Sequence, residues 1–169
     1  MNQLKEIAEF LLENDDFTVV GHAMPDGDCV GSVLGLYHAL KQLGKKVQVV
    51  LQDAVPPIYL YLAGADIIKT PQLMENHTEN LVFLDCGDEE RVGDDLLLRL
   101  AQRKLAVNID HHQANSLFAD YNYVETNAAA TAEIIYNLIQ TMQVELTPEI
   151  SASLLAGIIM DTGSFMNSN

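Results

Sequence analysis

Short apolar segments alternate with helix-like segments along most of this chain. The first apolar segment, residues 17–20, precedes a polar turn, and apolar positions at helical spacing follow over residues 30–43. Further strands are expected at residues 46–52, 67–68, 81–85 and 105–109. Helices are expected near residues 4–12, 93–102 and 128–143 and from Thr147 onward, with a short helical segment within 55–62. Strands alternating with helices predict a three-layer α/β domain with a parallel sheet.

Helix ends carry local signals as well. Thr126 or Asn127 is expected to cap the helix at 128–143, because both side chains can accept a hydrogen bond from a free N–H group of the first turn. Thr147 is expected to cap the last helix, and Pro148 suits its first position.

Acidic residues and histidines follow the apolar segments. His22, Asp26 and Asp28 lie within seven residues after the first strand. Later polar residues that follow apolar segments are Asp85, Asp110, His111, His112 and Asp161. Parallel sheets bind ligands at the carboxyl ends of their strands, and histidines with carboxylates can hold a divalent metal. For a single aspartate a helix cap is an equally good explanation, but the combination with later partners favours metal binding.

The same segments resemble the motifs of the DHH phosphoesterase family. The matching pieces, in the family order, are GHAMPDGDCVGS, LDCGD, NIDHH and GIIMDTGSF, and they span nearly the whole chain. Four separate motifs are a far more specific signal than any one of them. The resemblance implies a three-layer, parallel-sheet, Rossmann-like DHH domain and a metal-dependent phosphoesterase activity.

The resemblance also implies a site for two metal ions. It assigns one ion to His22, Asp26 and Asp85. It assigns the other to Asp28, Asp85, His111 and Asp161, with Asp85 bridging the two. Mixed imidazole and carboxylate donors favour Mn²⁺, with Mg²⁺ or Co²⁺ as substitutes. Four ligand carboxylates balance two divalent ions, so the loaded site can admit a phosphate that the bare carboxylates would repel.

Other residues are candidates for the reaction and for substrate contacts. His112 resembles the family's phosphate-contacting residue and is the expected proton donor to the leaving oxygen. Asp110 is expected to orient a ligand as an acceptor or to contact a metal itself. Further candidates for substrate contacts are Ser32, Asn127, Thr131 and Arg91, for which helix packing or a solvated helix start is the alternative explanation.

Composition restricts the partners. The formal net charge is −15, and no lysine or arginine follows Lys104. A basic stripe for nucleic acid is therefore lacking, and bound metals would have to supply the positive charge for a phosphate.

Cys29 and Cys86 lie inside two different motifs. We therefore expect both to be buried packing residues rather than a disulfide or soft metal ligands. No apolar stretch is long enough to span a bilayer and no signal peptide is recognisable, so we expect no membrane contact and a soluble, cytoplasmic protein.

The wording of the motifs favours one branch of the family. Pro25-Asp26-Gly27-Asp28 and residues 129–133 resemble the nanoRNases, which act as oligoribonucleases and as phosphatases of 3′-phosphoadenosine 5′-phosphate (pAp). The chain has no tryptophan and no basic groove for a long strand, so the expected partners are pAp and short RNA of about two to five units. Alternatives are a type II-like inorganic pyrophosphatase, a RecJ-like single-strand exonuclease and, in another class, a non-catalytic nucleotide-binding domain.

Residues 1–169 are expected to form one catalytic, metal-binding domain. In the family a linker and a C-terminal substrate-binding domain follow, and this sequence shows no counterpart of them. The expectation is therefore a fragment or an unusually short protein that grips its substrate weakly. A homodimer stays open as an alternative to a monomer.

Overall fold

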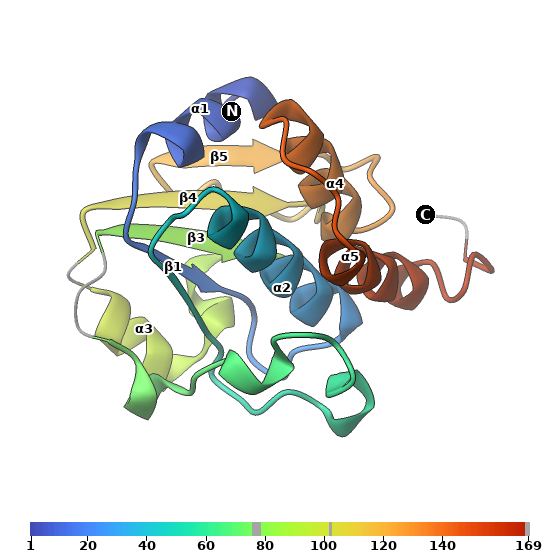
Figure 1. Ribbon diagram of the computed structural model, residues 1–169. Helices are drawn as coiled ribbons and strands as arrows, with labels where there is room; N and C mark the ends of the chain where they lie inside the picture. Colours follow the sequence, from blue (N-terminus) through green and yellow to red (C-terminus); the bar gives the residue numbers. More distant parts are fainter. Residues whose placement is uncertain (76–78, 102, 168–169) are drawn as a thin grey trace.

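The computed structural model describes residues 1–75, 79–101 and 103–167. Within these residues it has one five-stranded sheet flanked by helices (Figure 1). The strands are β1 (Phe17–Val20), β2 (Val47–Val50), β3 (Asn80–Leu84), β4 (Leu105–Asp110) and β5 (Tyr121–Val124). Their order is β2-β1-β3-β4-β5, and every neighbouring pair is parallel. The predicted parallel α/β sheet is therefore confirmed.

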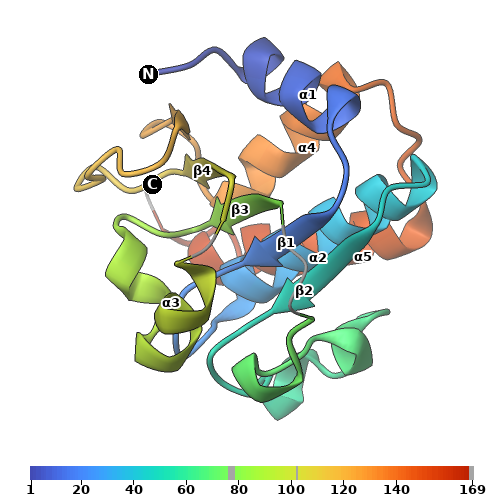
Figure 2. The same ribbon diagram turned by 90° about the vertical axis from the view of Figure 1, so that its left-hand side faces the viewer.

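Helices cover both faces of the sheet and complete three layers. The helices are α1 (Leu4–Glu13), α2 (Gly27–Gln42), α3 (Asp94–Leu100), α4 (Thr131–Thr141) and α5 (Pro148–Asp161), and the described residues between α2 and α3 include four short 3₁₀ turns. The larger core lies between one sheet face and α1, α2 and α4, and α5 packs against α2 and α4. On the opposite face of the sheet, α3 packs over a smaller hydrophobic core (Figure 2). No described helix has the length and apolar character to cross a bilayer.

The strand order reverses between β1 and β3. From β1 the chain runs outward to β2 and then returns to β3 on the other side of β1. The turns that follow β1 and β3 therefore diverge from neighbouring strand ends. Open α/β sheets bind ligands at such a reversal, outside the carboxyl ends of the strands.

Two glycines let α2 and α5 approach each other closely. A Cβ atom on Gly31 would lie 2.3 Å from the carbonyl oxygen of Ser153, and a Cβ on Gly157 would lie 2.8 Å from Asp28 Oδ1. Only glycine permits both approaches. This contact brings Asp161, the last residue of α5, over the start of α2.

The structure differs from the expected elements in three places. The strand β5 was not predicted, because it is a four-residue edge strand with three half-exposed side chains and no continuous apolar run. The strand expected at residues 67–68 is wrong, since Ala65–Ile67 form a 3₁₀ turn and a single bridge joins Lys69 to Val50. Helix α2 begins at Gly27, before the apolar positions that signalled it, so that Asp28 lies in its first turn.

The expected cap of α4 is also wrong. The helix begins at Thr131, and its N-cap residue is Ala130 rather than Thr126 or Asn127. Alanine has no side-chain acceptor, so the free N–H groups of this helix need a partner from elsewhere. The predicted cap of α5 is confirmed, because Thr147 Oγ1 accepts a hydrogen bond from the Ile150 N–H.

Candidate metal centre

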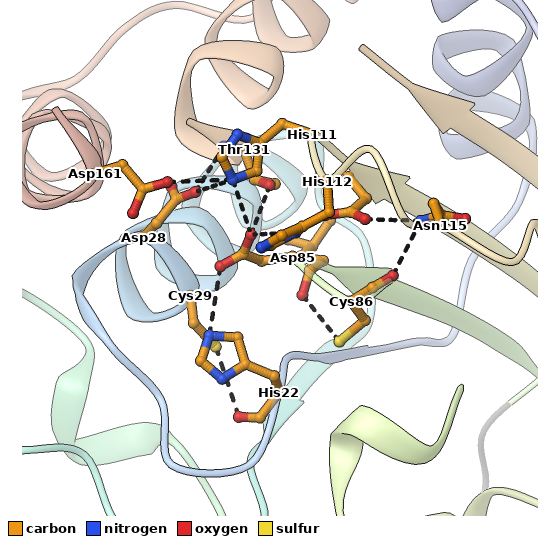
Figure 3. A network of polar contacts seen from close by, with 12 residues as sticks. His22, Asp28, Cys29, Asp85, Cys86, His111, His112, Asn115, Thr131 and Asp161 are labelled. Atoms are coloured by element: carbon orange, nitrogen blue, oxygen red, sulfur yellow. Dashed lines mark hydrogen bonds and ion pairs between the residues drawn. The ribbon is translucent and has the colours of Figure 1, made fainter. Parts of the chain in front are cut away.

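Asp85 lies at the centre of a cluster of acidic residues and histidines at the carboxyl edge of the sheet (Figure 3). Its Oδ2 is 3.5 Å from His22 Nε2, and its Oδ1 is 3.7 Å from His111 Nε2. Asp85 directly follows β3 and has φ of 61°, a region uncommon for residues with a side chain and enriched at functional sites. The two oxygens of one buried carboxylate thus face two different histidines.

The remaining members form one group on each side of Asp85. On one side, Asp26 Oδ1 lies 3.6 Å from His22 Nε2. On the other, His111 Nε2 lies 3.2 Å from Asp161 Oδ2 and 4.0 Å from Asp28 Oδ2. Each group of three offers donor atoms within 4.8 Å of one another. All six residues predicted as metal ligands therefore lie in one cluster. Asp85 belongs to the group of His22 and Asp26, and its other oxygen faces His111 of the second group.

The cluster has the character of a cation site. Asp28 and Asp85 are 0% and 3% exposed, and in the part of the chain that the structure describes their ion pairs involve histidines only. Buried carboxylates need compensating charge. Imidazole nitrogens and carboxylate oxygens are suitable ligands for Mn²⁺ and related ions, so these residues fit a divalent metal.

Asp28 also caps a helix from a distance. Its Oδ2 accepts a 2.6 Å hydrogen bond from the Thr131 N–H, and its Oδ1 accepts one of 2.9 Å from the Ala132 N–H. These are the free N–H groups of α4 that Ala130 leaves without a cap. Ser32, a predicted substrate contact, is buried behind Asp28 and donates to its Oδ1 at 3.2 Å. The orientation of Asp28 is therefore fixed by α2 and α4 together.

Asp26 caps a helix and also faces the cluster. Its Oδ1 accepts hydrogen bonds of 3.1 Å from the N–H groups of Asp28 and Cys29, so it is the N-cap of α2. The same carboxylate faces His22.

Cys29 and Cys86 are fully buried and form no disulfide, as predicted. Burial raises the pKa of both thiols well above the ordinary value.

Thr131 lies inside the cluster rather than at its rim. Its hydroxyl donates a 2.9 Å hydrogen bond to Asp85 Oδ1, and the residue is completely buried. The sequence left Thr131 as either a phosphate contact or a helix-packing residue. Its place in the structure makes it a support for the central carboxylate.

His112 lies beside the cluster and is held by Asp110. The ring atom Nδ1 is 2.7 Å from Asp110 Oδ1 and 3.7 Å from Asp85 Oδ1. Asp110 is completely buried, whereas the His112 side chain is 47% exposed. Asp110 therefore acts as a hydrogen-bond acceptor, as expected, and the ring that it orients is that of His112. Asn115 donates to the other oxygen of Asp110 at 2.7 Å, a contact that no sequence signal indicated.

Two predicted substrate contacts lie at different distances from the cluster. Arg91 lines a shallow depression of about 280 Å³ together with His112 and the turn after β3. Asn127 is exposed, donates to Glu125 Oε1 at 3.0 Å and lines a separate depression beside α4. The structure thus brings Arg91 near His112 but leaves Asn127 outside the donor groups.

The acidic surroundings shift the proton affinities of the cluster. Burial opposes protonation of His22, but hydrogen bonds with Asp26 and Asp85 outweigh it and raise its pKa to about 10. Burial likewise opposes protonation of His111, but Asp161 and the nearby charges of Asp85 and Asp28 raise its pKa to about 9. Burial, reinforced by the charges of Asp85 and Asp161, raises the pKa of Asp28 to about 8. Without metal, the cluster therefore holds protons in place of cations.

Once freed of metal with a chelator, the protein is expected to lose thermal stability as the pH rises from about 6.5, the ordinary histidine pKa, to 9. The folded-state pKa values of His22, His111 and Asp28 are all raised. The stabilisation from such groups is complete below the unfolded-state pKa and is lost as the pH rises through the folded-state pKa. We expect the melting temperature to fall by about 5 °C or more over this range.

Mn²⁺ is expected to stabilise the protein more as the pH rises, because the ligands must lose their protons before they bind the ion. The increase in melting temperature on adding Mn²⁺ should therefore grow with pH. His22→Gln should flatten the pH slope of the metal-free protein. His38→Gln is the matched control, since His38 contacts the Ala63 carbonyl outside the cluster. A metal-free melting temperature that increases between pH 6.5 and 9 would contradict this interpretation.

Comparison with known sequences gives a family match that covers most of the chain. The profile described as the DHH family, N-terminal domain, matches residues 16–158. This range contains five of the six predicted ligands, and Asp161 lies just beyond it.

Several relatives are similar over nearly the whole chain. The bifunctional oligoribonuclease and PAP phosphatase NrnA of Thermus thermophilus is 38% identical over 152 residues, which cover 89% of this chain and 44% of that protein. The cyclic-di-AMP phosphodiesterase GdpP of Geobacillus thermodenitrificans is 30% identical, over 94% of this chain and 26% of that protein. The crystal structure of an exopolyphosphatase-related protein from Bacteroides fragilis superimposes with a TM-score of 0.88 at 25% identity, over 96% of this chain and 51% of that one. The chain thus spans about half or less of each.

Proposed function

Because this chain belongs to the DHH family, we propose that it is a phosphoester hydrolase that works with two divalent metal ions, Mn²⁺ being the expected ion. The observation that carries this proposal is the position of Asp85, whose two oxygens face His22 and His111 on opposite sides. A carboxylate in that position can serve both metal ions at once.

The proposed ligands follow from the two donor groups. His22, Asp26 and Asp85 would hold one ion. Asp28, His111 and Asp161 would hold the other, with Asp85 shared. When bound, a pair of divalent ions neutralises charge on the phosphoryl oxygens and lowers the pKa of water.

His112 is the proposed acid. Because Asp110 accepts at Nδ1, the Nδ1 atom carries a proton, and the second ring nitrogen, Nε2, remains for the substrate. The hydrogen bond that His112 donates to Asp110 also raises the pKa of His112, which favours the doubly protonated ring. An imidazolium in this position can contact a phosphate oxygen and donate its Nε2 proton to the leaving oxygen.

Short nucleotides are the proposed substrates. The relative with 38% identity is an oligoribonuclease and PAP phosphatase, and this chain lacks the basic residues that hold a long strand. We therefore propose pAp and RNA of about two to five nucleotides as substrates. A cyclic dinucleotide is the second candidate, since two cyclic-di-AMP phosphodiesterases are 30% and 31% identical over 94% of this chain.

The test is hydrolysis by the 169-residue protein loaded with Mn²⁺. A ribodinucleotide, pAp, cyclic di-AMP, pyrophosphate and a long single strand are compared at equal concentration, with and without a chelator. We expect Mn²⁺-dependent release of mononucleotide from the dinucleotide or of AMP from pAp. A clear preference for pyrophosphate or for the long strand would favour the corresponding alternative, and binding without hydrolysis would favour a non-catalytic domain.

A further inference from the structure

Among the described residues, the side chains that hydrogen-bond to the Asp110 carboxylate are those of His112 and of Asn115, which lies in the loop after β4. We propose that Asn115 is a positioning residue that acts on His112 through Asp110. This inference rests on the proposed function, because the role it assigns to Asn115 is to keep the proton donor in place.

The hydrogen bonds of Asn115 fix the direction of its amide. Nδ2 donates to Asp110 Oδ2 at 2.7 Å and to the Cys86 carbonyl oxygen at 3.2 Å. Oδ1 accepts from the Leu117 N–H at 2.8 Å. A rotated amide would place its oxygen against a carboxylate and a carbonyl, so only this orientation satisfies all three partners.

Asp110 depends on this donor. The carboxylate is completely buried, and its two oxygens are divided between His112 and Asn115. Loss of the Asn115 donor would leave one buried carboxylate oxygen without that partner, at a cost in free energy. The carboxylate could then turn about its own axis, and Nδ1 of His112 would lose its fixed acceptor.

Asn115 also joins the ends of two strands. Cys86 follows Asp85 at the end of β3, whereas Asp110 is the last residue of β4. One amide group bonded to both sets the spacing between these two strand ends (Figure 3). That spacing determines the position of His112 relative to Asp85. The distance from His112 Nδ1 to Asp85 Oδ1 is 3.7 Å.

Ser116 provides a matched control in the same loop. Its N–H and its hydroxyl both donate to the Gly87 carbonyl oxygen, at 2.8 and 3.3 Å. Ser116→Ala therefore removes one tether between this loop and the turn after β3 without touching Asp110. A general weakening of the loop should appear in both variants, whereas a positioning effect should appear in Asn115 variants alone.

The first experiment compares Asn115→Ala, Asn115→Asp and Ser116→Ala in the Mn²⁺-loaded protein. Both Asn115 variants are expected to lower kcat on the ribodinucleotide about 10- to 100-fold, the range typical when a group that orients a ligand is lost. KM should stay within about twofold and the metal content should not change, because neither substrate binding nor ligation is altered. Ser116→Ala should retain kcat within about twofold.

A double-mutant cycle tests whether Asn115 acts through His112. In the His112→Ala background, Asn115→Ala should lower kcat by less than about twofold more, because the group it positions is absent. An equal loss in both backgrounds would overturn the proposal, and so would an equal loss in Ser116→Ala.

A spectroscopic measurement separates this inference from the proposed function. Long-range nitrogen–proton spectra of histidines labelled with ¹⁵N in the Mg²⁺-loaded protein show whether Nδ1 of each ring carries a proton. Asn115→Ala should shift or broaden the His112 signal and leave that of His22 in place. An unchanged His112 signal would refute the positioning role even if the enzyme is active, whereas a changed signal without any hydrolysis by the unmodified protein would refute only the proposed function.

Discussion

Asp85→Asn is expected to remove both metal ions and nearly all activity. Asparagine tolerates the left-handed backbone conformation at this position, so the substitution leaves the turn intact while removing the charge that both groups share. A divalent ion supplies several kcal/mol of transition-state stabilisation, so the loss of both should lower kcat/KM by at least about 10³-fold. Elemental analysis after Mn²⁺ loading, alongside hydrolysis of the dinucleotide, measures both effects.

Two further variants calibrate this result. Asp26→Asn should mainly weaken one ion, because Asp26 belongs to one group only. Asp95→Asn, on the exposed side of α3, should retain both ions and full activity. If Asp85→Asn still retained two ions per chain, Asp85 would not be the shared ligand.

His112→Ala is expected to lower turnover without changing the metal content. The loss of a general acid costs about 10²- to 10⁴-fold in rate, and His112 contacts the cluster from outside the two principal donor groups. The loss should depend on the leaving group, because p-nitrophenolate departs without a proton whereas a ribose oxygen needs one. We therefore expect a much smaller effect on bis(p-nitrophenyl) phosphate than on the dinucleotide.

This comparison discriminates between two roles of His112. Equal losses on both substrates, with KM raised, would indicate that His112 only binds phosphate. A fall in Mn²⁺ content would instead identify His112 as a ligand, as its membership of a third donor group with Asp85 and His111 allows.

The central strands and the cluster were predictable because they depend on continuous features of the sequence. β1, β3 and β4 are buried on both faces and appear as short, mostly apolar segments, with Thr18 and Asn108 as polar residues inside β1 and β4. Within two residues each is followed by an acidic residue or a histidine, and parallel strands direct those residues to one edge. Asp85 and His111 could therefore be placed together before any coordinates were known.

The remaining contacts could not be predicted, because they join segments that are distant in the chain or locally featureless. The cap of α4 comes from Asp28, 103 residues before Thr131, so local propensity pointed to the wrong residues. β5 is a short edge strand without an apolar run. Asn115 lies in a loop whose residues show no periodic pattern, and only the folded loop brings it to Asp110.

The double duty of Asp28 affects how related sequences can be interpreted. A descendant that had lost catalysis would still need Asp28 to cap α4 and Asp26 to cap α2, because both helix starts depend on them. Selection for folding alone would thus preserve Asp26 and Asp28 of the first motif in an inactive protein. The described hydrogen bond and ion pairs of His111 involve no free N–H group of a helix start. The presence or absence of His111, rather than that of Asp26 and Asp28, would therefore distinguish active enzymes from inactive proteins with the same fold.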